Sequence, residues 1–275
     1  NGITEVMRVA ADEIRPHETL ATIDYRGQKI KAYNMAEIFG MGDCECRYAV
    51  ITCLGKSTWA ALVSDIGGEV DIVSRPVPDV LCLPRFVSGA TELADGRAAL
   101  IIHPEYLKDA LIQRDEQYRS GAWQWAGEVP NLTLNQGQLE VMVFRVGSGT
   151  FALPTGLVRE VADMRAITHL PTLRPLWEGI CFIRGICHGV ASLGSPAPFE
   201  DGSSSRLIVL HVPKATAIAA TEVTNVVTIS AGDLKVEGKG CESKPLAEVA
   251  RFTWEGEQVA LLDVGSIVRK VLSET

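Results

Sequence analysis

Residues 60–66 of the sequence read Ala60-Ala61-Leu62-Val63-Ser64-Asp65-Ile66, and residues 217–223 read Ala217-Ile218-Ala219-Ala220-Thr221-Glu222-Val223. Each segment has four small or apolar residues, then a hydroxyl residue, an acidic residue and a β-branched residue. The second segment follows the first at an offset of 157 positions (217 − 60). An offset of this length is far too long for a solenoid repeat and indicates that a whole domain is duplicated.

Other segments recur at nearly the same spacing. Their offsets lie between 155 (160 − 5) and 160 (260 − 100). The pairs are Glu5-Val6 with Glu160-Val161, Arg26-Gly27 with Arg184-Gly185, Arg47-Tyr48-Ala49-Val50-Ile51 with Arg206-Leu207-Ile208-Val209-Leu210, and Leu100-Ile101-Ile102 with Ala260-Leu261-Leu262. We therefore predict two copies of one domain, with copy one at 1–112, a linker at 113–137 and copy two at 138–275.

Copy two opens with a segment that copy one does not contain. Residues 139–144 and 150–153 are strand-like runs on either side of Gly147-Ser148-Gly149, and this pattern predicts a β-hairpin. Copy one has either lost this opening hairpin or carries it upstream of residue 1. Because an unpaired strand edge invites aggregation, we expect another element to cover the gap.

Composition indicates a globular protein of two domains. The chain has 275 residues, of which 47% are hydrophobic and 22% charged, which is enough for more than one apolar core. The net charge of −8 argues against nucleic-acid binding, because an acidic surface repels phosphates. No apolar stretch reaches the roughly 20 residues of a membrane helix, and no signal-peptide pattern is present. The seven scattered cysteines suit reduced thiols in a cytoplasmic protein.

Most segments are short, rich in β-branched residues and bounded by Gly, Pro or Asp, as in 48–54 and 207–212. This pattern favours an all-β fold. Helices are few. Residues 34–40 begin with a capping Asn34 and have a Glu three positions on, and residues 104–114 begin with a proline.

No motif in the chain supports catalysis. Gly55-Lys56-Ser57 lacks the first glycine of a phosphate-binding loop, since position 50 is Val. Cys44 and Cys46 have no second Cys or His pair at zinc-site spacing. The five histidines lie in unrelated contexts. We therefore expect a non-catalytic chain with no cofactor and no bound metal.

The repeat unit resembles the CheW-like domain of bacterial chemotaxis. In copy two the resemblance rests on these stretches: 141–146, 151–154, 158–161, 179–185, 206–210, 220–223 and 260–263. Copy two departs from the family at Cys187-His188-Gly189, where a Val-Pro-Val-like strand is usual. Copy one is more similar to the C-terminal regulatory domain of the chemotaxis histidine kinase CheA, through 65–73 and 87–97.

The resemblance implies an all-β fold of tandem CheW-like domains, each with two five-stranded SH3-like barrels and a few short helices. In this family a groove receives the cytoplasmic tip of a chemoreceptor, and the barrel ends bind other CheW-like domains. The implied partner-binding residues are Val161, Gly179, Arg184 and Gly185 in copy two, and Val6, Arg26 and Gly27 in copy one. The residues alone also fit a simpler interpretation, in which each Arg-Gly pair only forms a turn and both valines belong to the core.

Three functions remain open from the sequence. The first is a cytoplasmic scaffold at membrane-associated receptor arrays, forming the C-terminal part of a CheA-type kinase and binding CheA, CheW and the receptor tip. The second is a free-standing tandem CheW adaptor. The third is an SH3-like peptide-binding module outside chemotaxis. We expect the chain neither to bind nucleic acid nor to insert directly into a membrane.

Overall fold

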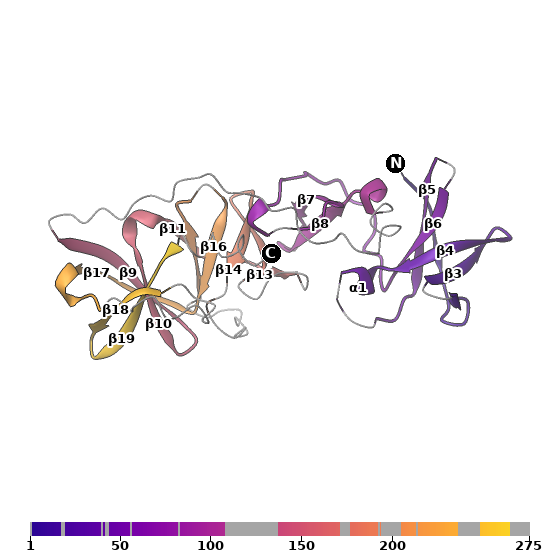
Figure 1. Cartoon of the computed structure of the whole chain (residues 1–275). Coiled ribbons are helices and arrows are strands. Elements are labelled where there is room, and N and C mark those ends of the chain that lie inside the picture. The colour runs from indigo at the N-terminus through magenta and orange to yellow at the C-terminus, as the bar shows by residue number, and fades with distance from the viewer. Residues whose placement is uncertain are drawn as a thin grey trace. The chain divides into compact units, whose positions relative to one another are not determined.

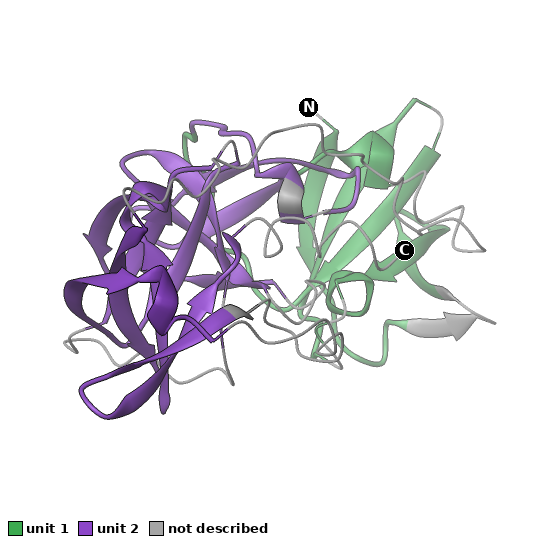
Figure 2. Cartoon of the chain, turned by 60° about the vertical axis from the view of Figure 1, so that its left-hand side comes forward, with its two compact units in different colours: residues 1–72, 102–114 green, residues 73–101, 115–275 purple. Residues whose placement is uncertain are grey.

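The computed structural model describes residues 2–17, 20–39, 41, 44–55, 57–81, 83–107, 137–170, 177–191, 193, 205–212, 214–235 and 248–264. The chain divides into two compact units, coloured separately in Figure 2. Unit 1 comprises residues 1–72 and 102–114, and unit 2 comprises residues 73–101 and 115–275. Of the predicted linker, residues 113–136 lie outside the described part of the chain.

Unit 1 is built on a six-stranded sheet with the order β1-β5-β6-β4-β3-β2 (Figure 1). Its neighbours are antiparallel except for β4 and β6, which run parallel. Alternate residues of neighbouring strands, among them Ile23, Ile30, Ile51 and Leu62, form one buried core. The strands are β1 (Ile3–Arg8), β2 (Arg15–His17), β3 (Leu20–Tyr25), β4 (Gln28–Asn34), β5 (Tyr48–Leu54) and β6 (Ser57–Val63).

The same sheet recurs in copy two. Its order is β11-β15-β16-β14-β13-β12, and the parallel pair is again the equivalent one, β14 with β16. An irregularity between Val158 and Glu160 in β11 repeats the one between Ile3 and Glu5 in β1. The two predicted copies are therefore confirmed. The strands are β11 (Val158–Asp163), β12 (Thr168–His169), β13 (Trp177–Ile183), β14 (Ile186–Ala191), β15 (Arg206–Leu210) and β16 (Thr216–Ala220).

The strand registers correct one pairing made from the sequence. Val6 pairs with Val50 in copy one, and its counterpart Val161 pairs with Ile208 in copy two. Ile208 therefore corresponds to Val50, whereas the sequence comparison set it against Ala49 and was wrong by one residue. A slip of one residue moves every side chain to the other face of a sheet. The sequence does not reveal this shift, because both strands carry apolar residues on both faces and so show no alternation of apolar and polar residues.

A five-stranded sheet of order β17-β9-β10-β19-β18 completes copy two. The predicted opening hairpin is present as β9 (Gln138–Val146) and β10 (Gly149–Pro154), two antiparallel strands. On one side β9 pairs with β17, and on the other side β10 pairs in parallel with β19. The hairpin is therefore the centre of this sheet. The remaining strands are β17 (Glu222–Ser230), β18 (Glu248–Trp254) and β19 (Glu257–Leu262).

Copy one has only part of this second sheet. Its counterparts of β18 and β19 are β7 (Val87–Glu92) and β8 (Ala98–Ile102), which form a two-stranded sheet. An isolated bridge between Arg75 and Ala90 repeats the bridge between Lys235 and Arg251 in copy two. Residues 65–74, at the place of β17, form no strand. Within the described residues, the counterparts of β18 and β19 thus form a two-stranded ribbon, and the counterpart of β17 lies outside any strand.

The compact units do not follow the boundary between the copies. Residues 73–101 belong to copy one by sequence, yet they fold with copy two in unit 2. Leu81, Ala90 and Ala98 lie in the same buried core as Trp177 and Ile180 of β13. Polar contacts reinforce this packing.

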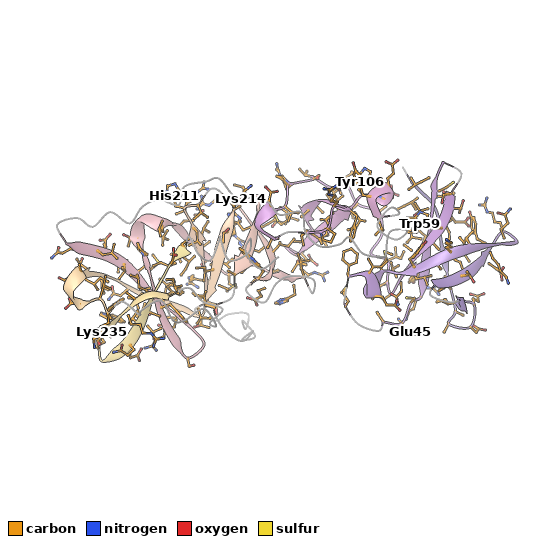
Figure 3. The ribbon with its side chains drawn as sticks, viewed as in Figure 1. Glu45, Trp59, Tyr106, His211, Lys214 and Lys235 are labelled. Carbon is orange, nitrogen blue, oxygen red and sulfur yellow. The ribbon has the colours of Figure 1, made fainter. Side chains whose placement is uncertain are left out.

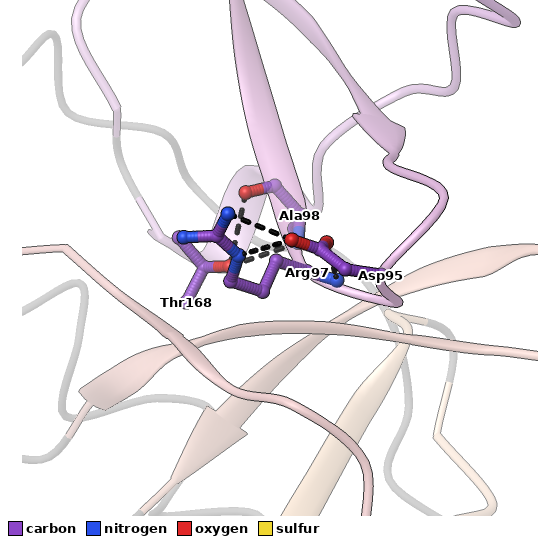
Figure 4. A network of polar contacts seen from close by, with 4 residues as sticks. All are labelled: Asp95, Arg97, Ala98 and Thr168. Carbon is purple, nitrogen blue, oxygen red and sulfur yellow. Dashed lines mark hydrogen bonds and ion pairs between the residues drawn. The ribbon is translucent and has the colours of Figure 1, made fainter. Parts of the chain in front are cut away.

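The hydroxyl of Thr168 bonds twice to the backbone of Ala98, donating to its carbonyl at 3.0 Å and accepting from its N–H at 2.9 Å (Figure 4). Beside it, Arg97 pairs with Asp95 in the β7–β8 turn at 2.7 Å. Lys214, labelled in Figure 3, pairs with Asp79 of the short helix η1 (Asp79–Leu81). Residues 73–101 are therefore fixed to copy two by both apolar and polar contacts.

The fold is all-β with short helices, as predicted. Helix α1 (Met35–Ile38) begins at Asn34, whose side chain accepts a hydrogen bond from the N–H of Ala36 at 3.0 Å. This is the capping role that the sequence indicated. Residues 104–107 are helical, and the rest of the helix predicted there lies outside the described residues. Two short 3-10 turns are η2 (Thr155–Leu157) and η3 (Ala231–Asp233).

Candidate protein-interaction surface

Each Arg-Gly pair forms the tight turn of a β-hairpin. Arg184 and Gly185 connect β13 to β14 with φ values of 51° and 73°, and Arg26 and Gly27 connect β3 to β4 with φ values of 53° and 78°. Two consecutive positive φ values match the twist of a two-residue hairpin. Asn or Gly would fit the first position with less strain, since a left-handed conformation costs a residue with a Cβ roughly 1 kcal/mol. The arginines are therefore poorly explained by the turn alone.

Both turn arginines form an ion pair with the same strand position. Arg184 Nη2 lies 2.7 Å from Glu160 Oε2 on β11, and Arg26 Nη2 lies 2.9 Å from Glu5 Oε2 on β1. Both β11 and β1 are edge strands of their sheets, and two strands separate each of them from the turn in the sheet order. The ion pair therefore shows that each sheet curls until its edge strand approaches the turn, as in a barrel.

Copy one adds an aromatic residue to this contact. The Tyr25 hydroxyl donates to Glu5 Oε2 at 2.9 Å, and the Arg26 guanidinium lies 5.1 Å from the centre of the Tyr25 ring. The hydrogen bond from Tyr25, followed by the one from Arg26, lowers the pKa of Glu5. The same bond raises the pKa of Tyr25. Glu5 is thus held as a carboxylate within a small charged cluster on the surface.

Apolar side chains are exposed beside both ion pairs. Val161, next to Glu160, is 39% exposed, and Val6, next to Glu5, is 46% exposed. The expectation that these valines belong to the core is wrong. Their side chains lie on the face of the strand that is open to solvent, and the alternation of their neighbours does not reveal which face that is. Ile186 follows the turn in copy two and is 46% exposed.

These residues define two equivalent surfaces. We name them the turn patches. The copy-two patch consists of Glu160, Val161, Arg184, Gly185 and Ile186, and the copy-one patch consists of Glu5, Val6, Tyr25, Arg26 and Gly27. Each contains an ion pair and, one residue along the strand from the glutamate, an exposed valine. This mixture is typical of a surface that binds another protein.

The structure does not bring Gly179 to the copy-two patch. It lies in β13 opposite His169 of β12, and a Cβ there would lie 2.1 Å from the carbonyl oxygen of Thr168. Gly179 therefore permits the close approach of β12. Gly179 precedes Arg184 by five residues along the chain, and its place in the sequence motif reflects packing between neighbouring strands.

Sequence reasoning missed the glutamates and Ile186 as members of the site. The signal was available for the glutamates, because Glu5-Val6 and Glu160-Val161 had already been matched between the copies. An acidic residue that recurs in both copies, together with a recurring arginine, is a candidate ion pair. Ile186 gave no such signal, since its counterpart in copy one is Gln28.

Among the described residues of copy two, burial disfavours the charged forms of three titratable groups. Burial raises the pKa of both Cys181 and Cys187 to about 12, so that these thiols stay protonated. Burial also lowers the pKa of His188, which is held neutral beside the carbonyl of Ile186 at 2.9 Å from its Nδ1. Among the described residues, no group of three or more His, Cys, Asp or Glu could hold a metal ion. Within the same residues, no helix is long and apolar enough to cross a membrane.

Comparison with known proteins gives the family. The family model of the CheW-like domain matches residues 1–111 and 140–272, and the chain belongs to this family. Among solved structures, the chain is similar to the scaffolding protein TtCheW from Thermoanaerobacter tengcongensis. That match has 17% sequence identity and a TM-score of 0.40, and covers 47% of this chain and 86% of TtCheW. No curated protein matches the chain.

Proposed function

We propose that this chain is a cytoplasmic chemotaxis scaffold that couples chemoreceptors to their histidine kinase by binding proteins. The observation that carries the proposal is the pair of turn patches on tandem CheW-like domains. In each one, a strained turn arginine is held by a glutamate beside an exposed valine. A non-catalytic role agrees with the chemistry of these residues, which can bind a partner but hold no nucleophile activated by a base.

The receptor's cytoplasmic coiled-coil tip is the partner that we assign to the turn patches. An amphipathic helix presents an apolar stripe flanked by charges, which can contact an exposed valine and compete for the charges of an ion pair. CheA and CheW are the further partners, through other CheW-like domains. Two patches on one chain would raise the overall affinity for a clustered receptor, because the second contact forms at high effective concentration.

The finer assignment is that the chain forms the C-terminal part of a CheA-type kinase. The resemblance of residues 65–73 and 87–97 to the regulatory domain of CheA supports this assignment over a free-standing tandem adaptor. Codons for Asn- and Gly-rich nucleotide-binding boxes upstream of Asn1 in the gene would support the kinase assignment. A start codon immediately before Asn1 would instead support the free-standing adaptor.

A co-sedimentation experiment tests the receptor contact. The purified chain is mixed with membranes that carry the cognate receptor, and compared with the double variant Arg26→Asn, Arg184→Asn. Asparagine favours the left-handed turn and removes the guanidinium, so the hairpins are kept while the ion pairs are lost. We expect the double variant to bind about tenfold or more weakly, as for the loss of an interface anchor.

The matched control is the double variant Arg47→Asn, Arg145→Asn. These arginines also form exposed ion pairs, with Glu45 at 2.9 Å and Glu257 at 3.1 Å, one in each copy and outside the turn patches. The control should bind like the unmodified chain. Equal binding of all three proteins would mean that the turn arginines are not part of the receptor site. If none of them sediments with receptor membranes, the coupling function is wrong and an SH3-like module outside chemotaxis becomes the better hypothesis.

A further inference from the structure

Residues 73–101, which we name the docked segment, are held on copy two by side chains rather than by a shared sheet. Among the described residues, the strands β7 and β8 of this segment pair only with each other. Leu81, Ala90 and Ala98 are nevertheless at most 5% exposed, in the core that they share with β13. At both of its ends the docked segment continues into unit 1. It is therefore a piece of one copy that is seated on the other.

A glycine of copy two makes room for the docked segment. Gly189 of β14 lies directly opposite Ile180 of β13, and Ile180 belongs to the shared core. A Cβ at Gly189 would lie 3.0 Å from Leu81 Cδ2 and 3.1 Å from the Trp177 ring. The absence of a side chain at Gly189 therefore lets Leu81 approach the strand closely.

Polar groups of copy two are placed to match the docked segment. The Thr168 hydroxyl contacts both the N–H and the carbonyl of Ala98, and Lys214 pairs with Asp79. One hydroxyl thus satisfies two backbone groups of β8 that have no strand on that side to pair with. We name the residues of copy two that make these contacts the docking face: Thr168, Ile180, Gly189 and Lys214.

Copy one does not have this face. Counted from the Arg-Gly turns, the strand registers set Thr22 and Lys31 at the places of Ile180 and Gly189. Lys31 is exposed, whereas Ile180 is buried. A lysine in place of Gly189 would fill the space that Leu81 occupies and would bring a charge into an apolar contact. The docking face is therefore specific to copy two, although both copies have the same strand order.

We infer that the docking face is a self-association surface, which accepts the docked segment of a second copy of this chain in place of its own. An exchanged dimer repeats the contacts of the monomer, so exchange is a low-cost route to a dimer. Opening the contact breaks side-chain packing and a few polar bonds, and no described backbone ladder has to break. Because the contact within one chain has a high effective concentration, exchange should increase with the concentration of the chain.

Two variants of the whole chain test this inference by complementation. Leu81→Asp spoils the docked segment and leaves the docking face intact. Gly189→Lys, which takes the residue of the counterpart Lys31, blocks the face and leaves the segment intact. Native mass spectrometry of the mixture should show about tenfold or more heterodimer than either variant alone shows homodimer, since only the mixture offers a sound segment to a sound face. The matched control is the double variant, which should form no dimer with either single variant.

A second pair of variants leaves the apolar core untouched. Asp79→Lys and Lys214→Asp each bring like charges together within one chain, at a surface position. In their exchanged heterodimer both contacts join opposite charges, so this mixture should dimerise more than its control. The control mixes the unmodified chain with the chain that carries both substitutions. It contains the same residues, but exchange there brings like charges together.

The inference is overturned if the complementing mixture stays monomeric while hydrogen exchange shows β9 and β10 still protected in both variants. It is also overturned if each variant alone dimerises as strongly as the mixture, because another surface would then carry the association. If Leu81→Asp unfolds copy two, the charge variants decide, and equal dimerisation of their mixture and its control refutes the inference. No receptor is present in these experiments, so their failure leaves the proposed scaffold function untouched.

Discussion

Replacing Leu81 by Ala is expected to destabilise copy two, although Leu81 belongs to copy one by sequence. Leu81 is 4% exposed and lies in the core that contains Trp177 and Ile180. Its Cδ2 also packs closely on Gly189 of β14, where an added Cβ would lie 3.0 Å away. A Leu-to-Ala change at a buried site lowers the free energy of unfolding by about 3 kcal/mol, because apolar side-chain burial is lost and a cavity is left behind.

The assay is hydrogen exchange resolved by peptide. A loss of about 3 kcal/mol raises the opening equilibrium of the destabilised unit about a hundredfold. We expect this acceleration in β13 and β14 of unit 2, with little change in β3 and β4 of unit 1. The matched control is Leu62→Ala, because Leu62 is 1% exposed and lies in the unit 1 core with Ile23 of β3 and Ile30 of β4. It should accelerate β3 and β4 instead. The reasoning is refuted if Leu81→Ala accelerates exchange in β3 and β4 and leaves β13 and β14 unchanged.

Three further outcomes follow from the described residues. Arg184→Asn should raise the free energy of unfolding by about 0.5–1 kcal/mol, because asparagine relieves the strain of the positive φ and only one ion pair at the surface is lost. A fall of more than about 1 kcal/mol in thermal unfolding would mean that the ion pair stabilises the fold. Because burial lowers the pKa of His188 in the folded chain, the unfolded chain binds a proton at His188 more tightly than the folded chain does. The free energy of unfolding, measured in urea, should therefore fall as the pH drops below about 6.5. The variant His188→Ile, which takes the residue of the counterpart Ile30, should lose that part of the pH dependence, and an unchanged profile would exclude His188 as its source. A thiol reagent at pH 8 should modify the exposed Cys53 quickly and the buried Cys187 only on unfolding, since the pKa of Cys187 is raised to about 12; equal rates would contradict the burial of Cys187.

The parts of the fold that the sequence predicted rest on local pattern. The repeated strand order follows from short β-branched runs that recur in the same sequence at nearly constant offsets. The Arg-Gly turns were found because a two-residue hairpin needs positive φ, for which glycine at the second position is a strong marker. The helix at Asn34 was found because a capping side chain acts within its own turn.

Other parts could not be predicted, because they depend on which segments meet in space. The exposure of Val6 and Val161 depends on which face of each sheet is left uncovered, and nothing in a run of apolar residues marks that face. The pairing of Glu160 with Arg184 depends on the curl of a six-stranded sheet, in which the two residues come from strands that are not neighbours. Gly179 entered the candidate site through the family resemblance, although the structure shows that it permits the close approach of β12.

The sequence by itself determined that this protein contains two copies of an all-β domain, and that residues 139–154 of copy two have no counterpart within residues 1–112. Both facts are carried by periodicity and by self-comparison, which need no knowledge of distant contacts. Only the tertiary structure decided that residues 73–101 fold with copy two. The physical reason is burial. Leu81, Ala90 and Ala98 are buried in a core with Trp177 and Ile180, and the residues that share a core are those close in space rather than in sequence.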